Sequence, residues 1–171
     1  LGRKFGGSVG GALNNLIGGW QLSGLVRYRS GLPFDISNRA RFSTNYYGAG
    51  RALIVGDVKS QGGADNNQGV PGAFYDSRGA ASRMRFNRTG LIGPRNIFRA
   101  DDLFNTDLAL GKRFQMPFEG HSLQFRWEVF NAFNNVNFSL RGLQQRYDRP
   151  AVLGQYNSTD APRTMQFALR Y

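Results

Sequence analysis

Strict alternation of apolar and polar residues is the feature that most constrains this chain. In residues 122–133, Leu123, Phe125, Trp127 and Val129 fall on one side of an extended chain, with Gln124, Arg126 and Glu128 on the other. A helix over this segment would place Arg126 among apolar neighbours and would form no continuous apolar stripe. A period of two residues is the pattern of a β-strand with two different faces.

Three further segments show the same period. In residues 16–31, Trp20, Leu22, Gly24, Val26 and Tyr28 share one face, and Leu25 is an exception on the other face. Residues 103–114 and 163–171 alternate in the same way. The sequence therefore predicts an all-β fold, an antiparallel meander of about four strands at 16–31, 103–114, 122–133 and 163–171.

The connections between these strands differ greatly in length. Residues 115–121 contain Pro117 and Gly120 and predict a tight hairpin, whereas residues 37–102 and 134–162 are long, polar loops. Residues 61–69 approach low complexity, and we expect them to add nothing to a core. Alternating strand directions place both long loops at one end of the sheet and the tight turn at the other. Outer-membrane barrels sort their loops in this way, with the long loops outside the cell.

Composition excludes several kinds of chemistry. The 171 residues contain no cysteine, which excludes disulfides, thiolate metal sites and cysteine nucleophiles. The single histidine, His121, disfavours a multi-histidine metal centre. The neighbouring carboxylates Asp101 and Asp102 point apart in an extended chain and indicate a strand entry rather than a catalytic pair. Asp65 begins a stretch that fails the calcium-loop pattern, and we expect a flexible tip there. We expect no catalytic residue, no metal, no cofactor and no enzymatic activity.

Several segments resemble the C-terminal barrel end of TonB-dependent outer-membrane receptors, closest to the subgroup with a carboxypeptidase-regulatory-like domain. They are Gly18-Gly19-Trp20-Gln21-Leu22-Ser23-Gly24, Ser30-Gly31-Leu32-Pro33-Phe34, Asn105 to Phe114, Leu123 to Phe138, and the segment 163–171, which ends on an aromatic residue. The resemblance implies a plugged barrel of about 22 strands. Residues 1–171 would supply its last four strands, with no plug domain present.

The resemblance also gives each strand face a role. It implies that Met165, Phe167, Leu169 and Tyr171 form the signal read by the barrel assembly machinery. The lipid-facing residues would be Leu22, Val26, Leu108, Leu110, Phe125 and Trp127, together with Phe167 and Leu169. The lumen-facing residues would be Arg27, Asp107, Gln124, Arg126, Glu128, Gln166 and Arg170. Aromatic girdles would contain Trp20 and Tyr171 at the periplasmic end, and Tyr28, Phe34, Phe104 and Phe133 at the outer end. Because the hydrophobic residues are spread at every second position and would face lipid, we expect that they need not form a core.

The resemblance implies transport of a ligand across the cell outer membrane. Expected partners are outer-membrane lipid and lipopolysaccharide, the assembly machinery, a small ligand held by loops 37–102 and 134–162, and the TonB energy-coupling protein through an N-terminal part outside this sequence. The formal net charge is +11, and residues 37–100 hold ten Lys or Arg against three Asp. The alternative is therefore a soluble basic β-domain that binds nucleic acid or acidic polysaccharide. We favour the barrel, with no nucleic-acid partner, because the basic residues are scattered and no recognition helix is evident.

Overall fold

The computed structural model describes residues 17–38, 50–62, 66–67, 69–116, 118 and 120–171. The chain divides into two compact units. The sheet unit contains the described parts of Leu1–Arg27, Asn105–Asn135 and Ala161–Tyr171, and the loop unit contains those of Tyr28–Phe104 and Val136–Asp160.

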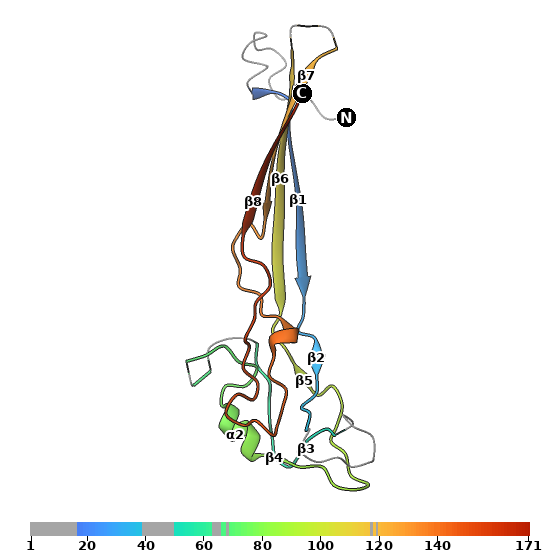
Figure 1. The fold of residues 1–171 in the computed structure, drawn as a ribbon, viewed down its shortest axis with the longest axis vertical. Helices are drawn as coiled ribbons and strands as arrows, with labels where there is room; N and C mark the ends of the chain where they lie inside the picture. Colours follow the sequence, from blue (N-terminus) through green and yellow to red (C-terminus); the bar gives the residue numbers. More distant parts are fainter. Residues whose placement is uncertain (1–16, 39–49, 63–65, 68, 117, 119) are drawn as a thin grey trace. The chain divides into compact units, whose positions relative to one another are not determined.

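Four long strands form one sheet, in the order β1-β6-β7-β8 (Figure 1). Their bounds are Trp20–Arg29 for β1, Leu103–Gln115 for β6, Ser122–Phe130 for β7 and Thr164–Arg170 for β8. β7 runs antiparallel to both of its neighbours, with Leu110, Trp127 and Phe167 opposite one another across three strands. Gly19 lies against the backbone of Arg113 and Gly24 against that of Asp107, so β1 is antiparallel to β6. The predicted all-β antiparallel meander is confirmed, and the sheet is not closed.

Asparagines end β7 earlier than the alternation predicts. Asn131 and Asn134 have φ angles of 52° and 54°, in the left-handed region that stops a strand. The backbone N–H of Asn131 donates to Asp107 Oδ1 at 2.9 Å, and its side chain exchanges hydrogen bonds with the backbone of Asn135. Asn134 Oδ1 accepts the N–H of Arg163 at 3.1 Å, one residue before β8 begins. These side chains therefore close the ladder at the ends of β7 and β8.

The turn between β6 and β7 is short, as predicted. The N–H of Met116 donates to the carbonyl of His121 at 3.1 Å, and the N–H of His121 donates to the carbonyl of Phe118 at 3.2 Å. Gly120 has a φ angle of 81°, which only glycine adopts without cost. The two strands are therefore joined by a hydrogen-bonded hairpin.

The loop unit contains short regular elements within the long connection 37–102. Short strand pairs join β2 (Pro33–Phe34) to β5 (Phe98–Arg99), and β3 (Leu53–Ile54) to β4 (Met84–Arg85). The helix α2 spans Ser77–Ser82 and the 3-10 helix η1 spans Leu140–Gly142. Asp76 caps α2 by accepting the N–H of Gly79 at 2.9 Å. In the described part of the chain, no helix has the length and apolar character needed to cross a membrane.

The loop unit also has a hydrophobic core, contrary to the expectation that none is needed. Phe74 is fully buried, and its ring centroid lies 6.1 Å from that of Phe34 and 5.2 Å from that of Phe98. Phe34 is only 3 % exposed, so its assignment to the outer girdle is wrong. Its neighbours are apolar residues that are distant in the sequence. The alternation of residues within one segment does not predict contacts between distant segments. The remaining core residues are Ile36, Ala52, Ala73, Ala80, Ala81, Met84, Ala100, Leu143, Leu153 and Tyr156.

Backbone hydrogen bonds join the two long loops within this unit. The N–H of Ser37 donates to the carbonyl of Gln145 at 2.8 Å, and the N–H of Tyr147 donates to the carbonyl of Ser37 at 2.9 Å. The N–H of Asp101 donates to the Tyr156 hydroxyl at 2.9 Å, and burial raises the pKa of that phenol. Segments 37–102 and 134–162 therefore fold together.

The described residues of the low-complexity stretch 61–69 form hydrogen bonds within this unit, and none of them belongs to its hydrophobic core, as expected. The N–H of Gln61 donates to the carbonyl of Ala73 at 2.8 Å. Asn66 is 5 % exposed, and its Oδ1 accepts the N–H of Val70 at 3.2 Å. Asp65, where a flexible tip was expected, lies outside the described residues.

Phe74 and Tyr75 provide a matched test of this core, since they are neighbours with 0 % and 64 % exposure. We expect Phe74→Ala to destabilise the loop unit by about 3–5 kcal/mol, because it empties the centre of an aromatic cluster. Tyr75→Ala should change its stability by no more than about 0.5 kcal/mol. Hydrogen exchange of the loop-unit amides measures both effects. Equal protection in the two variants would show that this core does not hold the loops together.

Candidate functional site

The sheet presents one apolar face. The strand pairing and the contacts of β1 place all predicted lipid-facing residues on the same side. We call this side the apolar face; from β1 to β8 it contains Trp20, Leu22, Gly24, Val26, Thr106, Leu108, Leu110, Lys112, Phe114, Leu123, Phe125, Trp127, Val129, Met165, Phe167, Leu169 and Tyr171. The prediction that these lipid-facing residues share one side agrees with the strand register.

Several large side chains of this face are exposed, mainly those of its two outer strands. Leu22, Phe167 and Leu169 are 73 %, 68 % and 68 % exposed, and every residue of β1 and β8 is exposed. The Trp127 and Phe167 rings stack across the strands, with centroids 6.0 Å apart. An apolar surface that spans a whole sheet marks contact with another apolar phase, because water would oppose its exposure.

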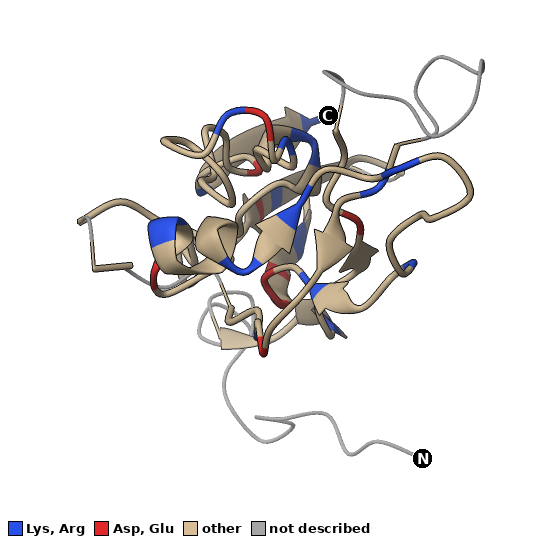
Figure 2. Cartoon of the chain, turned by 90° about the horizontal axis from the view of Figure 1, so that it is seen from below, with Lys and Arg blue, Asp and Glu red and all other residues tan. Residues whose placement is uncertain are grey.

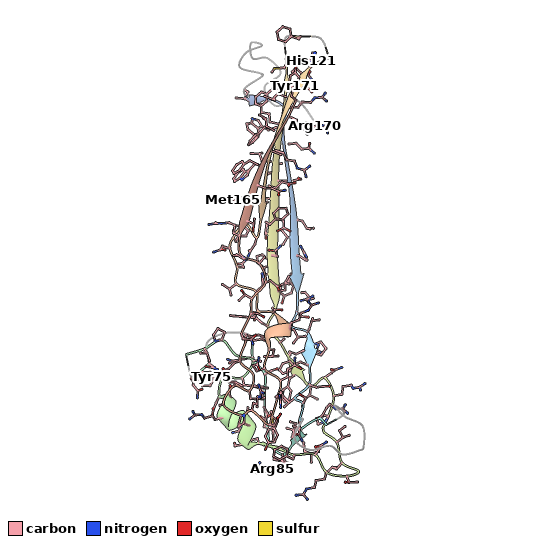
Figure 3. All side chains as sticks on the ribbon, viewed as in Figure 1. Tyr75, Arg85, His121, Met165, Arg170 and Tyr171 are labelled. Atoms are coloured by element: carbon pink, nitrogen blue, oxygen red, sulfur yellow. The ribbon has the colours of Figure 1, made fainter. Side chains whose placement is uncertain are left out.

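Cationic and aromatic groups gather at the hairpin end of the apolar face. The Lys112 Nζ lies 4.6 Å from the Trp20 ring centroid and 4.9 Å from that of Phe114. Tyr171 and His121 stack with centroids 5.4 Å apart, and the Tyr171 hydroxyl lies 2.7 Å from His121 Nδ1 (Figure 3). Amphipathic aromatic rings are typical of a membrane interface. Lys112, Phe114 and His121 therefore lie beside Trp20 and Tyr171, the two residues predicted for the periplasmic girdle.

Lys112 is the residue of this girdle that sequence reasoning missed. Its side chain is 2 % exposed, which is unusual for a lysine. The alternation in β6 carries the signal, because position 112 shares the parity of Leu108 and Leu110.

The opposite side, which we call the polar face, carries charged and small residues. Arg27 pairs with Asp107 at 3.4 Å. Glu128 pairs with Arg126 and accepts a hydrogen bond from Gln166, which links β7 to β8. Arg170 lies on the same side by register. The predicted lumen-facing set therefore shares one side. A hollow of about 140 Å³ lies between Gly111, Gln124 and Arg126 on this face.

The predicted assembly signal lies along β8. Met165 and Phe167 lie opposite Val129 and Trp127, and Leu169 opposite Phe125. Their side chains and that of Tyr171 are 46–75 % exposed. β8 pairs with β7 on one edge, and no described strand pairs with its other edge. The predicted signal is thus an exposed apolar row next to an open strand edge.

Aromatic residues predicted for the outer girdle have different environments. Tyr28 and Phe133 are 66 % and 67 % exposed, and Phe104 is 42 % exposed. The Tyr28 hydroxyl donates to Asp102 at 2.9 Å, and the same carboxylate accepts the N–H of Gly31 at 2.7 Å. Asp102 thus fixes the chain beyond β1, in keeping with the strand-entry role expected for the Asp101-Asp102 pair.

Several arginines of the loop unit donate hydrogen bonds to backbone carbonyls of the same unit. Arg51 donates to the carbonyl of Gly93 at 2.9 Å, Arg83 to that of Asp57 at 2.8 Å, and Arg85 to those of Ser82 and Met84 at 2.7 and 2.8 Å. Figure 2 shows Lys and Arg at separate places along the chain rather than in one block. These arginines hold loops in place, which weakens the interpretation of the basic charge as a polyanion-binding surface.

Two hollows in the loop unit are candidate ligand sites. One, of about 290 Å³, lies between Asp57, Lys59, Tyr75 and Asp76. Its charged groups already have partners, since Lys59 pairs with Asp57 at 3.8 Å and Asp76 caps α2. The other, of about 360 Å³, lies between Phe86 and Tyr147. Among the described residues, no three His, Cys, Asp or Glu side chains gather as a metal site.

Comparison with known proteins gives one match. The family described as outer membrane beta barrel domain has a model that matches residues 1–166 of the chain. No curated protein and no solved structure matches the chain.

Phe125 and Gln124 are adjacent residues on opposite faces and test this assignment of faces. We expect Phe125→Arg to destabilise the protein in a bilayer by about 2–4 kcal/mol, because it places a charge in hydrocarbon. Gln124→Arg should change stability by no more than about 0.5 kcal/mol. Urea unfolding in lipid vesicles measures both. Equal destabilisation would contradict a lipid-facing apolar side.

The contact between His121 and Tyr171 can be tested by a double-mutant cycle. Tyr171→Phe keeps the ring and removes the hydroxyl, so we expect a loss of about 0.5–1 kcal/mol, the size of one hydrogen bond. The same change should cost nothing further in a His121→Ala background. Unfolding of the four proteins in vesicles gives the coupling energy. Additive effects would show that the two side chains do not interact.

Proposed function

Because the chain belongs to the outer membrane beta barrel domain family and is located in the outer membrane, we propose that it is the C-terminal barrel portion of a TonB-dependent receptor. In this role it forms part of the wall through which a ligand crosses the outer membrane. The subgroup with a carboxypeptidase-regulatory-like domain is the one its motifs resemble. The outer-membrane location removes the alternative of a soluble basic domain.

The observation that supports the proposal most is the difference in length between the connections that join the four long strands. β6 and β7 are joined by a short hairpin, whereas the connections from β1 to β6 and from β7 to β8 both join the loop unit. In outer-membrane barrels the short turns are periplasmic and the long loops extracellular. The loop unit is then the part that meets a ligand arriving from outside.

The open sheet also supports a larger barrel. Unpaired strand edges are not stable in hydrocarbon, where every backbone group needs a partner within the protein. Four strands are too few to close, since the smallest membrane barrels have about eight. The free edges of β1 and β8 would pair with other strands of the receptor.

The two faces suggest how the wall works. The apolar face would contact lipid, and the polar face would line the lumen, where the pairs of Arg27 with Asp107 and Arg126 with Glu128 stabilise strand contacts. Energy for transport would come from the TonB protein, acting on a plug outside this sequence. We assign the chain no catalytic role and no cofactor.

The remaining partners follow from the same placement. Met165, Phe167, Leu169 and Tyr171 would present the signal to the barrel assembly machinery. Unpaired arginines of the loop unit would meet lipopolysaccharide phosphates, since guanidinium groups bind phosphate well. A small ligand would bind within the loop unit.

The native polypeptide tests this proposal. We expect the outer-membrane protein that contains this sequence to have a mass far above 19.0 kDa, to carry a plug domain, and to co-purify with TonB. Mass spectrometry of protein extracted in mild detergent measures all three, with a porin from the same membranes as the control for TonB association. A native 19.0 kDa protein that does not associate with TonB would contradict the proposal.

A further inference from the structure

The larger hollow of the loop unit lies where the two long loops meet. Its volume is about 360 Å³, within the range of small-ligand sites. Ala81 and Phe86 line it from the first loop, and Tyr147 and Pro150 from the second. A ligand bound there would contact both of the segments that the sequence predicted as ligand-binding.

The walls of this hollow are mainly carbon. The Phe86 and Tyr147 rings meet edge to face, with centroids 4.9 Å apart. The Tyr147 hydroxyl donates to the carbonyl of Met84 at 3.0 Å, so this ring is held in place and its polar tip is occupied. Rigid aromatic walls favour a flat ring, which can make offset or edge contacts with both side chains.

One charged side chain that lines this hollow, Arg78, is available to bind an anion. Ser82 Oγ is engaged with the carbonyl of Gly79 at 2.8 Å, and Asp148 accepts the Arg146 Nε–H at 3.2 Å. The guanidinium of Arg78, another lining residue, forms no hydrogen bond or ion pair with any described residue. Because Arg146 neutralises Asp148, the unpaired charge at the hollow is positive.

We propose that this hollow binds a flat, largely apolar anion, of which an arene carboxylate is the simplest example. The ring lies against Phe86 and Tyr147, and the carboxylate takes the bidentate hydrogen bonds that the guanidinium of Arg78 offers. The inference rests on the proposed function in one respect: it names the class of ligand that the extracellular loops would capture. Binding itself needs neither TonB nor transport.

Titration with two small probes tests the site in the native receptor reconstituted in nanodiscs. The probes are 1-naphthoate and the uncharged 1-naphthalenemethanol, followed by saturation-transfer NMR, with empty nanodiscs as the control for partition into lipid. We expect Arg78→Gln to weaken naphthoate binding by about tenfold, the effect of one lost charged hydrogen-bond pair, and to leave the alcohol unchanged. Arg95→Gln, an exposed arginine of the same unit that does not line the hollow, should change neither.

Two further variants separate the ring from the charge. Phe86→Ala should weaken both probes, and Arg78→Lys should keep part of the naphthoate affinity because it keeps the charge. Equal loss in the Arg78→Gln and Arg95→Gln variants, or no saturable naphthoate binding, would overturn the proposal. Preference for an uncharged sugar or for inorganic phosphate alone would also overturn it. Naphthoate binding by a protein that does not associate with TonB would sustain this site and defeat only the proposed function.

Discussion

The need to satisfy every backbone N–H and C=O inside a bilayer governs this structure. Within hydrocarbon only helices and paired strands meet it, and this chain uses strands. Pairing forces the pleat, and the pleat sends successive side chains to opposite faces. Leu110, Trp127 and Phe167 therefore form one row on one side of the sheet while Arg126 and Glu128 lie on the other, and we propose that the row faces lipid.

The same chain buries apolar residues in two different ways. In the sheet unit, large apolar side chains such as Leu22, Phe167 and Leu169 stay exposed, and we propose that lipid surrounds them. In the loop unit Phe34, Phe74 and Phe98 form a core of the kind found in water-soluble proteins. Arginines such as Arg51 and Arg83 bind backbone carbonyls around this core, since loops with little regular structure leave many carbonyls without partners.

Local patterns predicted the sheet well because strand faces depend only on residue parity. Lys112 could have been placed by the same rule, and its position among Trp20 and Phe114 follows from it. The core of the loop unit was not predictable in this way. Phe34 contacts Phe74 and Phe98, which lie in distant segments of the chain. The polar, glycine-rich composition of residues 61–69 gave no indication that Asn66 is buried. The end of β7 was misplaced because the hydrogen bond from Asn131 to Asp107 joins two strands.

The central claim is that β7 separates lipid from water residue by residue. Because the sequence contains no cysteine, a spin label can be placed at each position from 123 to 129 through a single introduced cysteine. In lipid vesicles, oxygen reports contact with lipid and a water-soluble nickel complex reports contact with water. We expect high oxygen accessibility at 123, 125, 127 and 129, and high nickel accessibility at 124, 126 and 128. Accessibility without a period of two, or with the opposite phase, would contradict it.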